Sequence, residues 1–286
     1  MGRRTARRRL TQVSFTGAQV RIRERAEEVA VEEPLEIRVA GQTVTVTMRL
    51  PGNDMELVHG LLVAEGIVHA KDDVLVARYC ADTDTMNVID VTLSDGPRPL
   101  PVNAQRTLVM HGGCGLCGKA SIDAITGSCP PATVEVDVVD ASVIRGLADK
   151  LLAQQPVRAR TGGTHGAGLF TRSGDLVVAR EDIGRHNAVD KVIGWSVMND
   201  HDRSADVLMV SSRASFDIVQ KAAMAGIGVL CCVSAPSELA IDAAQETGVT
   251  LVAFDRGDRF TICTHAKRIT IGAQPAPASD AVGVDA

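Results

Sequence analysis

The stretch Val207-Leu208-Met209-Val210-Ser211-Ser212-Arg213-Ala214-Ser215 opens the segment whose pattern decides the fold. Four apolar residues precede a polar turn, and a helix is predicted over residues 215–225. A second short apolar run, residues 228–233, follows that helix. Short apolar runs separated by a helix are typical of buried parallel strands. The segment therefore predicts an α/β fold, in which helices pack on a partly parallel sheet.

The same alternation extends in both directions from this segment. The predicted order, αββαβαβαβ followed by an edge strand, indicates a three-layer α/β/α domain over residues 141–271. The other predicted elements of this domain are helices 142–154, 186–197 and 237–246 and strands 168–172, 176–180, 249–254 and 260–264.

This order of elements is also the order of the cytidine-deaminase fold. Deaminases carry His-x-Glu at the start of the second helix and Pro-Cys-x-x-Cys at the start of the third. Here the second helix opens with Arg185-His186-Asn187-Ala188, and the third opens with Ser211-Ser212-Arg213-Ala214-Ser215. The general acid/base Glu and both cysteine ligands are absent from these openings. We therefore expect a deaminase-like domain that has no catalytic zinc and does not deaminate cytidine.

The preceding part of the chain, residues 14–140, is predicted to be a β-rich domain, which makes the whole chain α+β. Apolar and polar residues alternate over 35–39 and 44–48 around Gly41-Gln42, which indicates a hairpin. Asn53 or Asp54 can cap a helix that reaches about Glu65. Further strands are predicted over residues 74–79, 86–93 and 133–139.

Both ends of the chain are predicted to be disordered. The first nine residues hold five arginines, and no apolar stretch follows them as a twin-arginine export signal requires. Residues 1–13 are therefore interpreted as a solvated basic arm. The tail over residues 272–286 is rich in Ala, Pro and Asp and lacks an apolar pattern.

Composition excludes several classes of function. The net charge of −5 gives no general attraction to nucleic acid or anionic lipid, and aromatic residues make up only 2% of the chain. No apolar run approaches the length of a transmembrane helix. The seven cysteines are odd in number and no signal peptide is recognisable, so reduced thiols and a cytoplasmic location are expected.

The run His111-Gly112-Gly113-Cys114-Gly115-Leu116-Cys117-Gly118-Lys119 has the features of a reactive site. Cys114 and Cys117 lie at CxxC spacing among glycines, which let the backbone approach a partner closely. A helix opening after Cys117, with Lys119 nearby, favours the thiolate, which is the reactive form of cysteine. Two readings remain open at this point. The thiols either perform sulfur or redox chemistry, or bind structural zinc with His111, Cys129 or a partner chain.

A second group of candidate residues lies in loops that precede helices or follow strands. Arg185 and His186 open one helix, Arg213 precedes the next, and Phe254-Asp255-Arg256-Gly257-Asp258-Arg259 follows the last long strand. Ligands of open α/β sheets bind at the carboxyl ends of strands, and the guanidinium group matches phosphate. The loops therefore predict a phosphate-bearing ligand, with Asp255 or Asp258 pairing with the N1 and N2 donors of guanine. Alternatively, the arginines form weak surface ion pairs with Glu181, Asp182, Asp255 and Asp258.

From about residue 14 to residue 270 the chain resembles the FdhD family, the formate dehydrogenase accessory sulfurtransferases. The segments that carry the resemblance are Cys114-Gly115-Leu116-Cys117-Gly118-Lys119-Ala120-Ser121, Thr161-Gly162-Gly163-Thr164-His165, Arg180-Glu181-Asp182-Ile183-Gly184-Arg185-His186-Asn187-Ala188-Val189-Asp190-Lys191, Ser211-Ser212-Arg213, Glu56-Leu57-Val58-His59-Gly60-Leu61-Leu62-Val63-Ala64-Glu65-Gly66 and Phe254-Asp255-Arg256-Gly257-Asp258-Arg259.

The resemblance implies a cytoplasmic homodimer that receives sulfur from a cysteine desulfurase. Cys114 would hold the sulfur as a persulfide, with Cys117 as its partner. The sulfur would pass to the molybdenum of a bis-molybdopterin guanine dinucleotide cofactor, bound as a substrate, before the cofactor enters formate dehydrogenase. The family's cofactor-binding segment corresponds to residues 254–259. An alternative reading is a chaperone that binds this cofactor and has structural or zinc-binding thiols.

Overall fold

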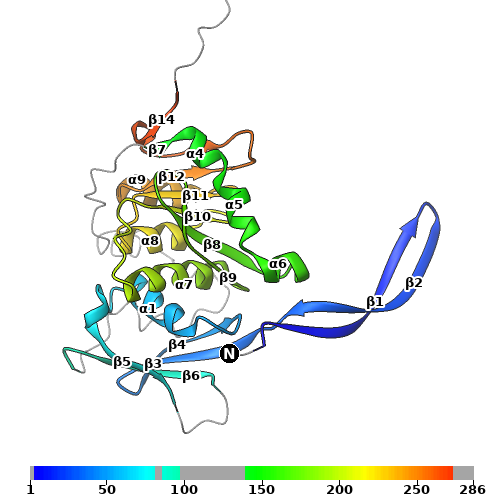
Figure 1. Ribbon diagram of the computed structural model, residues 1–286, viewed down its shortest axis with the longest axis horizontal. Coiled ribbons are helices and arrows are strands. Elements are labelled where there is room, and N and C mark those ends of the chain that lie inside the picture. The colour runs from blue at the N-terminus through cyan, green and yellow to red at the C-terminus, as the bar shows by residue number, and fades with distance from the viewer. Residues whose placement is uncertain (1–2, 81–85, 97–138, 273–286) are drawn as a thin grey trace, which may run out of the picture.

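The computed structural model describes residues 3–80, 86–96 and 139–272, which form two main sheets and the helices between and around them (Figure 1). Within these ranges, no helix is long and apolar enough to cross a membrane.

The larger sheet has six strands in the order β13-β12-β11-β10-β8-β9. The three central strands β10, β11 and β12 are parallel, and the others pair antiparallel, so the predicted partly parallel sheet is confirmed. The strands are β8 (His165–Phe170), β9 (Leu176–Asp182), β10 (Val207–Val210), β11 (Val229–Cys232), β12 (Thr250–Ala253) and β13 (Thr261–Ile262).

Helices cover both faces of this sheet, because successive strand residues point to opposite sides. Leu208 and Leu230 lie in a core with α7 (Arg185–Met198), α8 (Phe216–Met224) and α9 (Glu238–Glu246). Met209 and Cys231 lie in a second core against α4 (Ala141–Arg145) and α5 (Leu147–Ala153).

The helix predicted over residues 142–154 is divided in the structure. Gly146 separates α4 from α5, because its backbone N–H closes a short turn onto the carbonyl of Val143. A further helix, α6 (Pro156–Thr161), lies outside the predicted elements. Pro156 occupies the first helical turn, where its missing N–H costs nothing.

The second main sheet has four strands in the order β4-β3-β6-β5, with α1 (Asp54–Ala64) on one side. The predicted hairpin is confirmed as β3 (Glu33–Val39) and β4 (Gln42–Arg49), and the other strands are β5 (Val74–Tyr79) and β6 (Val88–Leu93). Of the strand predicted over residues 133–139, only Val139 lies within the described ranges. The remaining short elements are η1 (Lys71–Asp73), β7 (Val139–Asp140), η3 (Ala266–Arg268) and β14 (Ile269–Thr270).

The prediction of a disordered arm over residues 1–13 is wrong for the part that the structure describes. β1 (Thr5–Thr16) pairs antiparallel with β2 (Gln19–Ala30) in a long hairpin that extends away from the rest of the molecule (Figure 1). In this register Arg7 lies opposite Glu28, and Arg8 lies opposite Glu27. Opposite charges across two strands stabilise the pairing, so β2 supplies β1 with a partner that residues 1–13 alone do not contain. Residues 273–286 of the predicted tail lie outside the described ranges.

The two halves of the molecule share one core, which is built around the contact between α1 and α7. A Cβ atom on Gly60 of α1 would overlap the backbone carbonyl of Asp190, and one on Gly194 of α7 would overlap that of Glu56. Glycine is therefore required at both positions for this close helix packing. The helix predicted to begin at Asn53 or Asp54 thus joins the β-rich half to the α/β half.

Candidate functional site

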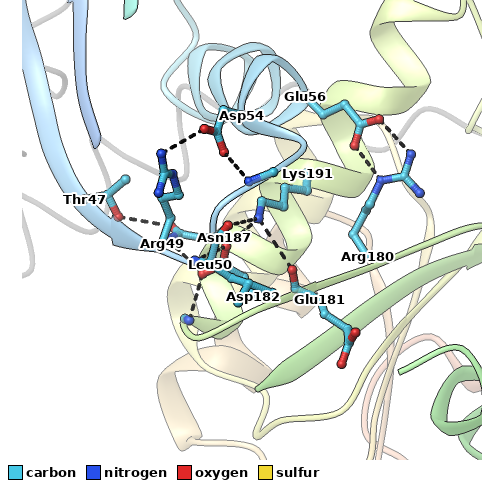
Figure 2. A network of polar contacts seen from close by, with 12 residues as sticks. Thr47, Arg49, Leu50, Asp54, Glu56, Arg180, Glu181, Asp182, Asn187 and Lys191 are labelled. Carbon is cyan, nitrogen blue, oxygen red and sulfur yellow. Dashed lines mark hydrogen bonds and ion pairs between the residues drawn. The ribbon is translucent and has the colours of Figure 1, made fainter. Parts of the chain in front are cut away.

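A buried polar network around Asp182 and Lys191 (Figure 2) fixes the loop between β9 and α7, and Arg185 and His186 are the first residues of α7. Asp182, at the end of β9, accepts a hydrogen bond from the backbone N–H of Leu50 at 3.1 Å and pairs with Lys191 Nζ at 2.7 Å. Its second oxygen accepts a hydrogen bond from the N–H of Gly184 at 3.1 Å. Asp182 therefore connects the loop after β9 both to α7, through Lys191, and to the N-terminal half, through Leu50.

Most acidic residues proposed as surface partners of the arginines have other roles. Glu181 and Asp182 are both buried. Glu181 accepts hydrogen bonds from the backbone N–H groups of Val157 and Arg158, which anchor α6. The surface ion-pair alternative is therefore wrong for Glu181 and Asp182, because both carboxylates bind groups inside the fold.

The loops predicted to bind an anion lie along one edge of the six-stranded sheet. The N–H of Ser211 donates to the carbonyl of Gly166, so the end of β10 lies beside the start of β8. The loop after β10 bonds to the loop after β11 through Ala214 and Ala235. The N–H of Phe254 donates to the carbonyl of Ser234, which extends this row of loops beyond β12.

At one end of this edge, the N-termini of α7 and α8 bring polar side chains together. His186 Nε2 lies 3.6 Å from a carboxylate oxygen of Asp217. Arg185 Nε, His186 Nε2 and Ser215 Oγ are buried, and none has a hydrogen-bond partner among the described residues. Buried polar groups are normally hydrogen-bonded, so three such atoms near two helix N-termini indicate a site for a polar ligand.

The electrostatics of this cluster suit an anionic ligand. Burial, with the nearby charges of Lys221 and Arg185, lowers the pKa of His186 to about 4. Burial, with Arg158 and Arg185, also lowers the pKa of His165. Both imidazoles are therefore neutral at pH 7 and act as hydrogen-bonding groups, while the positive charge comes from the arginines and Lys221.

At the other end of the edge, residues 254–259 form a tight turn. Asp255 is buried, and one of its carboxylate oxygens accepts a hydrogen bond from the N–H of Gly257 at 3.1 Å. Its other oxygen is buried without a hydrogen-bond partner among the described residues, and burial raises the pKa of Asp255. Phe254 has a φ of 55° and remains exposed beside it. The exposed side chains of this turn are those of Phe254, Arg256, Asp258 and Arg259, and Arg213, in the loop between β10 and α8, is exposed as well.

The structure brings all the predicted loop residues to one edge, but at different places along it. Arg185 follows β9 and Arg256 follows β12, and these strands are four positions apart in the sheet. At about 4.8 Å per strand, their ends are about 19 Å apart. Such a span fits a long ligand, for example a dinucleotide, better than a single phosphate group. Cys114 and Cys117 lie outside the described residues.

Lys221 and Asp217 belong to this site although the sequence gives no signal for either. Lys221 pairs with Asp190 at 2.7 Å and contributes positive charge beside His186. Both residues are ordinary charged positions of an amphipathic helix, so no pattern in the sequence distinguishes them.

The fold defines an α/β protein whose candidate ligand site lies at the carboxyl edge of its sheet, the usual location in this class. Residues 30–270 match the model of the FdhD/NarQ family, so the chain belongs to this family. Relatives described as "Sulfur carrier protein FdhD" are 49% identical in Mycobacterium tuberculosis (94% of this chain, 100% of the relative) and 45% identical in Streptomyces coelicolor (96% and 98%).

A solved structure confirms the fold. The crystal structure of a protein described as a formate dehydrogenase accessory protein, from Desulfotalea psychrophila, has a TM-score of 0.71 to this chain. It is 24% identical, and the match covers 92% of this chain and 99% of that protein.

Proposed function

We propose that this protein is a sulfur carrier for the maturation of formate dehydrogenase. It receives sulfur from a cysteine desulfurase as a persulfide on Cys114. It then passes that sulfur to the molybdenum of a bis-molybdopterin guanine dinucleotide cofactor, which it binds as a substrate before the cofactor enters the enzyme. The relatives' name supports the carrier role, and the row of loops at the sheet edge supports the cofactor as cargo.

The observation that carries the cofactor part of the proposal is the set of buried atoms, at both ends of the edge, that have no hydrogen-bond partner in the part of the chain that the structure describes. Arg185, His186 and Ser215 offer donors at one end, and Asp255 offers an acceptor at the other. The donors suit phosphate, and the carboxylate suits the N1 and N2 donors of guanine. A guanine dinucleotide carries the guanine at one end and its pyrophosphate beyond the ribose, so the base and the phosphates are separated along the ligand as the acceptor and the donors are along the edge.

The sulfur step follows ordinary thiol chemistry. The Cys114 thiolate attacks the terminal sulfur of the desulfurase persulfide, forms a new S–S bond and releases the desulfurase thiolate. If Cys117 then attacks the Cys114 sulfur, a Cys114–Cys117 disulfide forms and hydrosulfide leaves. If Cys117 only stabilises the persulfide, Cys114 would hold the terminal sulfur for direct transfer; the S–S bond would break, Cys114 would leave as the thiolate, and the acceptor would supply the two electrons that turn the transferred sulfur into sulfide.

Further parts of the proposal come from the family resemblance. The α/β half would be a deaminase-like domain without a catalytic zinc, since Arg185-His186-Asn187 and Ser211-Ser212-Arg213 stand where deaminases place their ligands and acid. The protein would act in the cytoplasm as a homodimer, with each copy holding one guanine dinucleotide arm of the cofactor.

Mass spectrometry after incubation with a cysteine desulfurase and cysteine tests the carrier role. The wild-type protein should gain one sulfur atom at Cys114, and Cys114→Ala should gain none and fail to support dehydrogenase maturation. Cys117→Ala should retain the added sulfur if Cys117 is the resolving thiol. Full maturation activity of Cys114→Ala would refute the persulfide assignment. It would instead favour the alternative of a cofactor-binding chaperone whose thiols are structural or bind zinc.

A further inference from the structure

The hairpin of β1 and β2 is the part of the structure that the proposed function leaves unexplained. From residue 7 to residue 26 every residue is exposed except Ser14, which is half-buried. Within the described residues, its contacts with the rest of the molecule lie near its base, where Arg160 pairs with Glu28 at 3.2 Å and Arg4 lies 3.8 Å from Glu181. An isolated two-stranded hairpin is marginally stable in water, so a ribbon about 40 Å long needs a partner.

The two faces of this ribbon differ in chemistry. Phe15 lies opposite Val20, and Val13 lies opposite Ile22, so these four side chains point to the same side near the tip. Phe15 is 73% exposed and Ile22 is 70% exposed. Contiguous exposed apolar side chains of this kind mark interaction surfaces. We call these four residues the apolar tip.

Charge is also divided between the two faces. On the face of the apolar tip, Arg7 and Arg9 are balanced by Glu24 and Glu28. The opposite face is basic, because only one acid is present among its four arginines. The charged residues of that face are Arg8, Arg21, Arg23, Arg25 and Glu27.

We propose that the apolar tip packs against the apolar tip of a second copy of this chain. A two-fold axis that runs along the ribbons, between them, places β1 of one copy over β2 of the other. Phe15 then faces the partner's Val20, and Val13 faces the partner's Ile22. Arg7 faces the partner's Glu28. Residues that lie opposite each other within one hairpin therefore also face each other between the two hairpins.

Self-complementarity favours a second copy over other occupants. A two-fold contact requires one surface that matches itself, and this face carries equal numbers of arginines and glutamates beside an apolar patch. A nucleic acid or an anionic membrane would be attracted to the other, basic face. Packing tip on tip leaves that basic face in solvent. The contact provides the surface for the proposed homodimer, and it does not depend on sulfur transfer or cofactor binding.

Sedimentation velocity of the full-length protein over a wide range of concentrations tests the inference. The wild type should show a reversible monomer–dimer equilibrium. Ile22→Glu buries an unpaired carboxylate from each copy and should weaken dimerisation by more than about 100-fold. Gln12→Glu adds the same charge on the opposite face, near Arg23, and should leave the equilibrium unchanged.

Hydrogen exchange provides a second measurement in case Ile22→Glu also disturbs the hairpin. In the wild type, amide protection of residues 7–26 should increase with protein concentration. A dimer that persists in Ile22→Glu would overturn the tip contact but not the homodimer. A monomer at every concentration, with unprotected hairpin amides, would overturn both. Pelleting of a monomeric wild type with phosphatidylglycerol vesicles, lost in Ile22→Glu, would assign the apolar tip to a lipid surface instead.

Discussion

At the scale of single residues, the two carboxylate oxygens of Asp255 differ in their hydrogen bonding. One accepts a hydrogen bond from Gly257, and the other is buried without a partner among the described residues. Leaving a buried acceptor unpaired costs free energy, and a ligand that donates hydrogen bonds to it recovers that cost. Asp255 is therefore the residue on which guanine specificity should depend.

Calorimetric titration of two nucleotides tests this role. Wild-type protein should bind GDP about 10-fold or more tightly than inosine diphosphate, which lacks the N2 donor. Asp255→Asn should lower GDP affinity and lose the preference, because the amide NH₂ cannot accept from the base. Asp258→Asn is the matched control, since Asp258 is exposed, and it should keep the preference. Retention of the preference in Asp255→Asn would assign guanine recognition to other residues.

The arginines of the edge are expected to bind phosphate. Arg213→Ala and Arg259→Ala should each weaken GDP binding by about 10- to 100-fold, the loss of one charged hydrogen bond. The same titration measures the effect. Arg78→Ala, which removes an arginine from the four-stranded sheet, is the control for lost charge. Equal affinity in all of these proteins would show that the edge loops do not form the site.

At the scale of elements, the crossing of α1 and α7 decides how the two halves of the molecule meet. Gly194→Ala should destabilise the protein by about 3 kcal/mol, because the added methyl group would push the helix backbones apart. Gly146→Ala, between α4 and α5, where a Cβ atom would make only ordinary contact with the carbonyl oxygen of Val143, should instead stabilise it by about 0.5–1 kcal/mol. Urea unfolding measures both changes. If Gly194→Ala left the free energy of unfolding unchanged, α1 and α7 could move apart without loss of stability.

The sequence predicts elements whose signal is local and misses those that depend on distant partners. The strands at 207–210 and 229–232 follow from their apolar runs, and the 74–79 strand was predicted with its observed bounds. β1 escaped prediction, because Arg7 and Arg8 lie opposite glutamates that belong to β2. For the site, the edge could be predicted from strand order, whereas the burial of Glu181 and Asp182 depends on contacts with α6 and Leu50.

At the scale of the whole molecule, buried histidines link stability to pH. Burial lowers the pKa values of His59, His165 and His186, that of His186 to about 4. The unfolded chain, in which histidine has a pKa of about 6.5, then binds more protons than the folded chain. Stability should therefore be complete above about pH 6.5 and fall as the pH drops toward the folded values.

Urea unfolding at about pH 7.5 and about pH 5 measures this dependence. The triple variant His59→Gln, His165→Gln and His186→Gln should lose much of the difference between the two conditions. His69→Gln, at an exposed position, should keep it. An unchanged difference in the triple variant would assign the acid sensitivity to carboxyl groups.

The shared core also has a consequence for synthesis on the ribosome. α1 ends about 120 residues before α7 begins, and its apolar side packs against α7. At roughly 5–20 residues per second, the nascent chain displays that side for about 6–24 s before its partner exists. The core of the N-terminal half therefore lacks its packing partner during synthesis. A cell that makes this protein has to protect the exposed apolar side of α1 from aggregation until α7 emerges.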